Sequence, residues 1–388
     1  MSLLGILESP AALLLAVLIG AICIRYIVRR CMQEFTRIKG DAGICSLVRV
    51  QFGDTRQWLS IRGNDRTNPV LLVVHGGPGF PEMPFAHENA QLEQEFVVVQ
   101  WDHRGAGKSF RLFRRKLALS IDLMVEDIRK VVEWLHQRLQ IEKVYLVAHS
   151  WGTVPAILAA SRYPDLFWAY IGVAQIADLM ASERQRYQYV LTKAQEQNNL
   201  AALADLRRFG ASSYTTYRQF KILDRWVRRF SREEFEPVSP MKFVRLAFSS
   251  PVYSWIDIVK LPLGFLFWVL EFFRQRFYNI DLFTQVSKLV VPVYFFQGCY
   301  DHLLSASVAE RYFQSLEAPS GKRFIWFENS GHWPQFEQPK KYREEIRSVL
   351  LAQKTLFKIN SSSKSREAIS DSTTKANLSP NAGMRGCT

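Results

Sequence analysis

The chain has 388 residues, of which 48% are apolar and 22% are charged, and this balance excludes a disordered polypeptide. Five scattered cysteines without a CxxC pair exclude a disulfide scaffold and provide no zinc-binding pattern. The formal charge of +14 admits nucleic acid or anionic lipid as a partner without choosing between them.

The chain begins with an apolar segment. Residues 3–24 are nearly all apolar, and a helix that crosses a bilayer needs about 20 such residues. The basic residues Arg25, Arg29 and Arg30 follow this segment, whereas a signal peptide carries its positive charge before the apolar run. We therefore predict an uncleaved membrane anchor over residues 1–30, rather than a signal peptide or a buried helix. Because basic flanks stay in the cytoplasm, the following domain is predicted to be cytoplasmic.

The middle of the chain alternates short apolar runs with helical patterns. The runs are β-branched or aromatic and bounded by turn residues, which is typical of buried strands; they are residues 70–74, 96–100, 144–148, 291–296 and 324–327. Ile121 to Leu139 has the apolar spacing of an amphipathic helix. This alternation predicts an α/β fold with a mostly parallel sheet covered by helices. It stops near Gln175 and resumes near residue 290, so we predict a core of residues 45–175 and 286–352 with an inserted helical cap over residues 176–285.

A glycine-rich turn, His75-Gly76-Gly77-Pro78-Gly79, follows the first predicted strand directly. Stabilising an oxyanion requires two backbone N–H donors. Gly77 is predicted to supply one of them, and the alternative is a plain turn.

A second loop, residues 104–109, follows the next strand and has the sequence RGAGKS. It ends like a phosphate-binding loop, but that pattern requires glycine at position 102, where this chain has Asp102. We interpret the loop as a support for the glycine-rich turn, with Asp102 and Arg104 in that role.

The most informative stretch is residues 144–152, VYLVAHSWG, in which a predicted strand runs into a predicted helix. Ser150 lies at the centre of a pattern that matches the nucleophile elbow G-x-S-x-G, with Ala148 in place of the first glycine. The backbone N–H of Trp151 is predicted to be the second oxyanion donor, at a helix N-terminus that favours negative charge. The alternative is a chance serine in a strand–helix turn.

A serine nucleophile needs a general base, and the base needs an acid that orients it. In this topology the acid and then the histidine follow the serine along the chain. Asp301 and His332 follow the last two predicted strands, at the carboxyl ends where open α/β sheets place their sites. We therefore predict the catalytic triad Ser150, Asp301 and His332. Asp281 is the alternative acid, and we expect it to cap a helix instead.

The remaining charge and apolar features lie in the cap and the tail. Residues 178–281 contain 16 basic and 11 acidic residues. Their apolar run Leu261 to Leu270 is too short to span a bilayer; cap packing, an acyl pocket and bilayer contact all remain open. Residues 355–388 are rich in Ser, Thr, Asn and Lys, which predicts a disordered tail. Most of the positive charge thus lies in the anchor region, cap and tail, where a membrane is a better partner than nucleic acid.

The motifs HGGPG, WDHRGAGKS, HSWG and ENSGHWPQFEQP together resemble the proline iminopeptidase-like (peptidase family S33-like) branch of the α/β-hydrolase fold. The resemblance covers roughly residues 48–350 and implies a serine hydrolase with Ser150, Asp301 and His332 as its triad beneath a helical cap. It implies an aminopeptidase that acts on small peptides or amides through an acyl-enzyme, with no metal or cofactor. Family aminopeptidases bind the substrate's amino group through cap glutamates, which no motif places in this cap. A membrane-associated esterase or lipase acting on apolar esters is the alternative, and the oligomeric state stays open.

Overall fold

The computed structural model describes residues 10–111, 117–209 and 216–352. The chain divides into two compact units, residues 1–343 and residues 344–388. Of the second unit, residues 344–352 are described and are helical. The predicted tail over residues 355–388 lies outside the described residues.

The first unit is built on one eight-stranded sheet with the strand order β1-β2-β4-β3-β5-β6-β7-β8. In chain order the strands are β1 (Ile44–Phe52), β2 (Thr55–Gly63), β3 (Val70–Val74), β4 (Val97–Asp102), β5 (Val144–His149), β6 (Phe167–Val173), β7 (Val293–Gly298) and β8 (Lys322–Phe327). The pairs β1–β2 and β2–β4 are antiparallel, and all other neighbouring pairs are parallel. The predicted α/β fold with a mostly parallel sheet is therefore confirmed.

The five predicted strands are all present, and three further strands were missed. β3 and β5 are buried along their whole length, so their sequences are continuous apolar runs. β1 alternates half-buried and exposed residues, and it pairs with β2 as a hairpin at the edge of the sheet. A mixed apolar and polar sequence of this kind does not stand out as a buried strand.

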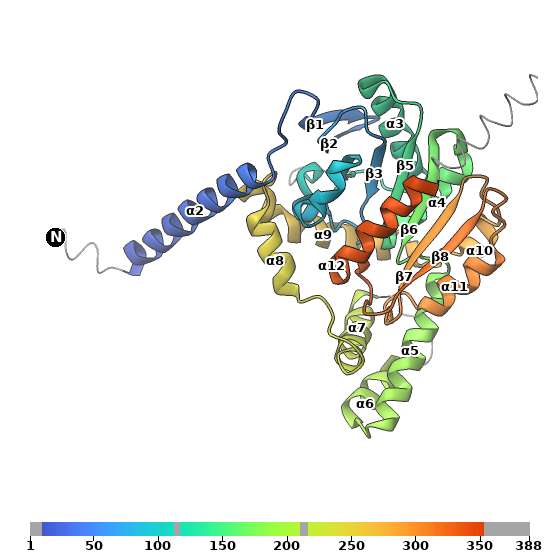
Figure 1. The fold of residues 1–388 in the computed structure, drawn as a ribbon. Coiled ribbons are helices and arrows are strands. Elements are labelled where there is room, and N and C mark those ends of the chain that lie inside the picture. Colours follow the sequence, from blue (N-terminus) through green and yellow to red (C-terminus); the bar gives the residue numbers. More distant parts are fainter. Residues whose placement is uncertain (1–9, 112–116, 210–215, 353–388) are drawn as a thin grey trace, which may run out of the picture. The chain divides into compact units, whose positions relative to one another are not determined.

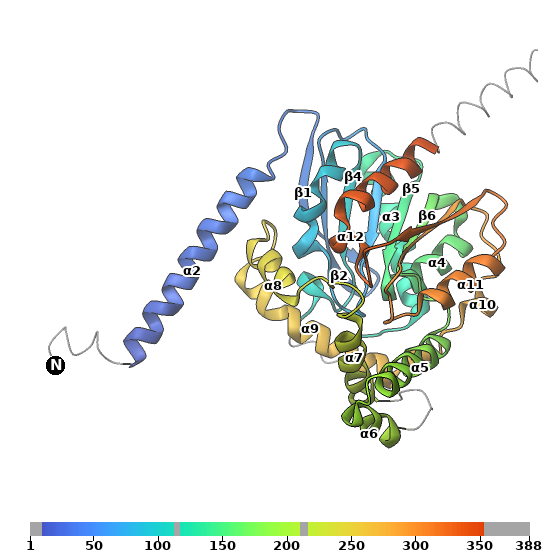
Figure 2. The ribbon, with the colours of Figure 1, turned by 60° about the horizontal axis from the view of Figure 1, so that its bottom comes forward.

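Helices cover both faces of the sheet (Figures 1 and 2). The predicted amphipathic helix is present as α3 (Ile121–Leu139), capped by the Ser120 side chain, which accepts a hydrogen bond from Leu123 N. α4 (Thr153–Arg162) follows β5, and α11 (Ala306–Ser315) follows β7. Apolar side chains of these helices join the strand residues in one continuous core.

Among the described residues, six α-helices lie between β6 and β7, where the alternation of strands and helices stops in the sequence. They are α5 (Leu179–Glu196), α6 (Leu200–Phe209), α7 (Tyr217–Ser231), α8 (Pro240–Ser249), α9 (Trp255–Arg274) and α10 (Leu282–Gln285). We refer to them as the cap helices. Local chemistry defines where they begin: Thr216 with Gln219 and Ser254 with Asp257 form capping boxes at the starts of α7 and α9.

The N-terminal apolar segment forms one continuous helix, α2 (Pro10–Phe35). Within the described residues it is the one helix long and apolar enough to cross a membrane. Its first half projects from the rest of the unit, and its second half lies beside α8 (Figures 1 and 2). The helix extends past the predicted end of the anchor at residue 30.

Candidate active site

Ser150 lies on a sharp turn between β5 and α4. Its φ of +51° is in the left-handed region, which a residue other than glycine occupies only at a cost of about 1–3 kcal/mol. Gly152 is required here, since a Cβ at that position would lie 2.5 Å from Val74 O and 2.6 Å from His75 O. Ala148 is buried in β5, so the position where the elbow pattern has glycine accommodates a methyl group.

The structure brings Ser150, His332 and Asp301 together. His332 Nε2 lies 2.9 Å from Ser150 Oγ, and His332 Nδ1 lies 3.0 Å from Asp301 Oδ2. The three side chains follow the carboxyl ends of β5, β8 and β7, and all three are buried. This is the arrangement of a nucleophile, a base and an orienting acid.

Asp301 is held as a carboxylate by several donors. Its Oδ1 accepts hydrogen bonds from Leu303 N at 3.0 Å and Leu304 N at 3.1 Å, and Gln297 Nε2 donates to Oδ2 at 3.1 Å. Burial favours a raised pKa for Asp301, but the charge and hydrogen bond of His332, aided by Leu304 N and Gln297, outweigh it and lower the pKa. Asp301 is therefore ionised at neutral pH and accepts a hydrogen bond from the imidazole of His332.

The glycine-rich turn lies directly against the elbow. A Cβ on Gly76 would lie 2.8 Å from Ser150 Cβ, so glycine is needed for this approach. The next residue, Gly77, has a φ of +118°, in the left-handed region that favours glycine. The structure thus brings Gly76, the chain neighbour of Gly77, against Ser150, and the indole of Trp151 is buried against Phe272.

The second loop, residues 104–109, comes shortly after the end of β4. Asp102, fully buried, accepts hydrogen bonds from Lys108 N at 2.8 Å and from the Tyr253 hydroxyl. Burial raises the pKa of Asp102 to about 7, against the opposing effect of these two donors. The ring of His103 stacks on the ring of His75 with centroids 3.6 Å apart. The contact with the glycine-rich turn is thus made by His103, whereas the hydrogen bonds of Asp102, predicted to support that turn, go to Lys108 and Tyr253.

Arg104 also has a structural position. It forms a buried ion pair with Asp127, with 2.6 Å between Nε and Oδ2. Its backbone oxygen accepts a hydrogen bond from Trp268 Nε1 of α9 at 3.1 Å. Arg104 thus joins the loop to α3 and to the cap helices.

Two residues beside the triad, His149 and Glu82, were not predicted from the sequence. His149 Nε2 lies 2.9 Å from the backbone oxygen of His332, and His149 Nδ1 lies 3.1 Å from Glu82 Oε1, at an ion-pair distance without hydrogen-bond alignment. Gln335 Nε2 donates to Glu82 at 3.3 Å. A histidine directly before the nucleophile was the available signal, but that position is variable in the elbow pattern.

Asp281 caps α10 by accepting a hydrogen bond from Phe283 N, as expected for it. In the described parts of the chain, no group of three or more His, Cys, Asp and Glu side chains is arranged to hold a metal ion.

Comparison with known proteins places this geometry in a family. The model of the alpha/beta hydrolase fold family matches residues 69–339. The chain is 32% identical over 307 residues to the probable aminopeptidase YbaC of Bacillus subtilis (strain 168), covering 78% of this chain and 95% of that protein. It is 25% identical over 292 residues to a proline iminopeptidase of Heyndrickxia coagulans, covering 72% and 90%.

Among solved structures, a membrane phospholipase A described as a bacterial virulence factor superposes with a TM-score of 0.60 and 19% identity, covering 89% of this chain and 97% of that one. At this identity the likeness concerns the fold. The family match and the relatives agree with the motifs and the topology. The chain is a hydrolase of the α/β-hydrolase fold family, similar to its proline iminopeptidase-like branch.

Proposed function

We propose that this protein is a serine hydrolase that works through an acyl-enzyme. Ser150 attacks the substrate carbonyl while His332 Nε2 takes the hydroxyl proton, and His332 then returns that proton to the leaving group. Asp301 holds the imidazole and stabilises its charged form. The observation that carries this proposal is the 2.9 Å contact between His332 Nε2 and Ser150 Oγ, continued by the 3.0 Å contact to Asp301.

The backbone N–H groups of Gly77 and Trp151 are the proposed oxyanion donors. Gly77 is the chain neighbour of Gly76, which closely approaches Ser150, and Trp151 directly follows Ser150 in the helical segment Ser150–Gly152. Such donors contribute about 2.7–4 kcal/mol each to transition-state stabilisation in serine hydrolysis. Water then attacks the acyl-enzyme with His332 again as the base.

The proposed substrate class is small peptides or amides with a free N-terminus. A relative named a probable aminopeptidase, which this chain matches over nearly the whole of that protein, supports this class. Proline iminopeptidases at lower identity support it too.

Esters of apolar acids are the second candidate class, favoured by the pairing of the cap glutamates. Glu183 is ion-paired with Arg186 at 3.0 Å, and Glu234 with Lys193 at 3.2 Å and His302 at 2.6 Å. To bind the amino group of a peptide substrate, one of these glutamates must give up its basic partner. An uncharged ester needs no carboxylate for its binding.

The proposed location is a membrane, with α2 as the anchor and the hydrolase unit on the cytoplasmic side. The apolar side chains of α2 from Leu13 to Ile24 are largely exposed, which suits lipid and not water. The basic residues that follow them favour retention of this end in the cytoplasm.

Turnover of two substrate sets tests the proposed chemistry. Proline naphthylamide represents the peptide class and nitrophenyl esters represent the ester class, with Ser150→Ala as the control. We expect Ser150-dependent release of naphthylamine at a kcat/KM above that for the esters. Hydrolysis that persists in Ser150→Ala would remove the serine mechanism, and ester turnover alone would select the second class.

A further inference from the structure

The outer face of α9 carries a row of exposed apolar side chains. They recur at alternating spacings of three and four residues, which places them on one side of the helix; they are Ile256, Val259, Leu263, Leu266 and Leu270. On α8, Met241 and Val244 are exposed in the same way. Outside α2, the described residues include eleven exposed large apolar side chains, and seven of these lie on α8 and α9. We call these seven residues the apolar face of the cap.

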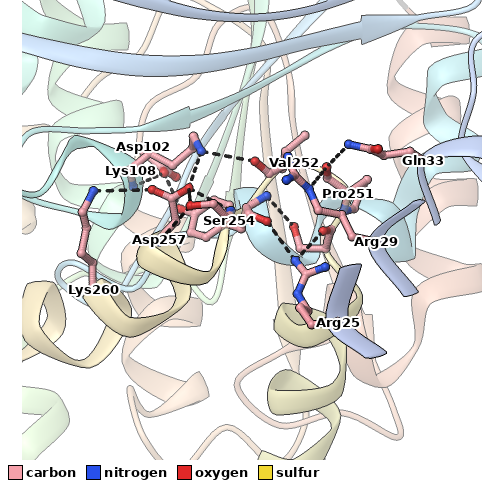
Figure 3. A network of polar contacts seen from close by, with 12 residues as sticks. Arg25, Arg29, Gln33, Asp102, Lys108, Pro251, Val252, Ser254, Asp257 and Lys260 are labelled. Atoms are coloured by element: carbon pink, nitrogen blue, oxygen red, sulfur yellow. Dashed lines mark hydrogen bonds and ion pairs between the residues drawn. The ribbon is translucent and has the colours of Figure 1, made fainter. Parts of the chain in front are cut away.

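The anchor helix meets the rest of the unit at this same place. Arg25 is buried and donates from Nη2 to the backbone oxygens of Ser250 and Tyr253, each at 2.9 Å. Arg29 Nε and Gln33 Nε2 both donate to Pro251 O, at 3.1 Å and 2.9 Å. Figure 3 shows these side chains of α2 pointing into the segment that joins α8 to α9. The apolar residues of α2 before Arg25 therefore end next to that segment.

This attachment orients the cap relative to a bilayer. If residues before Arg25 lie in lipid, as the proposed anchoring requires, the part of the unit nearest the lipid is the segment of residues 250–254 and the helices on either side of it. Those helices are α8 and α9, which carry the apolar face. Arg30 on α2 and Arg245 on α8 are exposed beside the attachment and suit anionic headgroups.

The inner side of α9 contacts the walls of the active site. A Cβ on Gly79 would lie 2.3 Å from Trp268, so α9 packs tightly on the glycine-rich turn. Phe272 of α9 meets Trp151 with ring centroids 5.4 Å apart. One helix thus has the predicted oxyanion turns on one side and the exposed apolar row on the other.

We propose that the apolar face of the cap docks on a phospholipid bilayer, with α9 lying in the interface between headgroups and acyl chains. The proposal rests on α2 being a membrane anchor. An amphipathic helix in this position buries its apolar side about 5–10 Å into the headgroup–acyl boundary. Docking places α9 between the lipid surface and the turns around Ser150, with its apolar row in the bilayer interface and Trp268 and Phe272 on the side of the site.

The test measures depth in the membrane with the full chain. The five native cysteines are changed to Ser, and single cysteines replace Leu266 on α9, Leu200 on α6 or Ile22 on α2, each labelled with an environment-sensitive fluorophore. Leu200 is the matched control because it is exposed and apolar, at 76%, but lies outside the apolar face. The proteins are placed in phosphatidylcholine–phosphatidylglycerol vesicles that carry nitroxide-labelled lipids.

We expect lipid nitroxides to quench the labels at 266 and 22 several-fold more than the label at 200. With the label moved to position 270, the double substitution Leu263→Glu and Leu266→Glu is expected to reduce quenching, whereas Leu200→Glu leaves it unchanged. Equal quenching at 266 and 200, with quenching at 22 intact, would overturn the proposal while the anchor stands. A label at 266 that is shielded and crosslinks to a second copy would also overturn it, because the face would then be a subunit contact. Absent quenching at 22 would remove the anchor on which it rests.

Fluorophosphonate labelling of Ser150 in the same samples reports on the hydrolase chemistry separately. The glutamate substitutions lie outside the predicted site, so retained labelling shows that the variants are folded. A lost depth signal with retained labelling therefore concerns the docking alone.

Discussion

At the scale of single residues, the structure accounts for why three distant side chains form one unit. Asp301 is ionised because its donors outweigh the effect of burial, and it accepts from His332 Nδ1. The other imidazole nitrogen then faces Ser150 as a proton acceptor. Asp102 is also buried, but there the effect of burial outweighs the hydrogen-bond donors and raises the pKa.

Replacing Asp301 with Asn tests the acid. The amide cannot stabilise a charged imidazole and favours the wrong tautomer of His332, so kcat is expected to fall by about 10⁴-fold while KM changes little. Steady-state kinetics on the better of the two substrate sets measures this. A fall of less than tenfold would show that Asp301 does not serve as the acid.

Replacing Asp102 with Asn tests the raised pKa. Because the folded state holds this proton up to about pH 7 and the unfolded state releases it near pH 4, stability is expected to decrease as pH rises through that window. The contribution is on the order of 2–4 kcal/mol. Urea denaturation at several pH values should show a smaller decrease for Asp102→Asn than for the native chain, and parallel curves would contradict this.

The three residues of the candidate triad could be predicted from the sequence because each of them lies in a recognisable local pattern. Ser150 lies in a strand–turn–helix pattern, and Asp301 and His332 lie in the loops that follow predicted strands. Glu82 has no such signal, and His149 occupies a position that varies in the elbow pattern; their contact joins the loop after β3 to the end of β5 and is created by the fold. Which donors hold Asp301 likewise depends on how the chain turns after β7.

At the scale of elements, α9 connects the cap to the site. Its inner residues Trp268 and Phe272 are buried against the turns around Ser150, and its outer residues are exposed. The sequence of α9 is apolar on nearly every side, so periodicity did not reveal which side faces inward. The same ambiguity explains why cap packing, a pocket lining and bilayer contact all remained open for residues 261–270.

Substitutions on the two sides of α9 should differ in effect. Trp268→Ala removes a buried indole and its hydrogen bond to Arg104 O, and is expected to destabilise the unit by about 3–5 kcal/mol. Leu270→Ala, on the exposed side of the same helix, is expected to change stability by less than about 0.5 kcal/mol. Chemical denaturation of both variants measures the difference, and equal losses would contradict the assignment of the two sides.

At the scale of the whole molecule, the helix α2 has two roles. Its first part suits a bilayer, and its last part holds the α8–α9 segment through Arg25, Arg29 and Gln33. The sequence indicated the anchor from length and charge. It gave no sign that the basic flank binds backbone oxygens more than 200 residues away, because that contact exists only in the folded unit.

Two truncations separate these functions. Removing residues 1–24 is expected to give a protein that lacks the proposed membrane-spanning segment and keeps the Arg25 contacts. Removing residues 1–35 also releases the buried oxygen of Ser250, which costs about 1–3 kcal/mol for each carbonyl left without a donor. Denaturation midpoints compare the two forms, and identical midpoints would show that the attachment adds no stability.

The central claim is that Ser150 is the nucleophile of this hydrolase, activated by His332. The most direct measurement is reaction of the membrane-bound full chain with a fluorophosphonate, followed by peptide mass spectrometry to locate the adduct. We predict one adduct on Ser150, with no labelling in Ser150→Ala and strongly reduced labelling in His332→Ala. An adduct on another serine, or undiminished labelling without His332, would contradict the account.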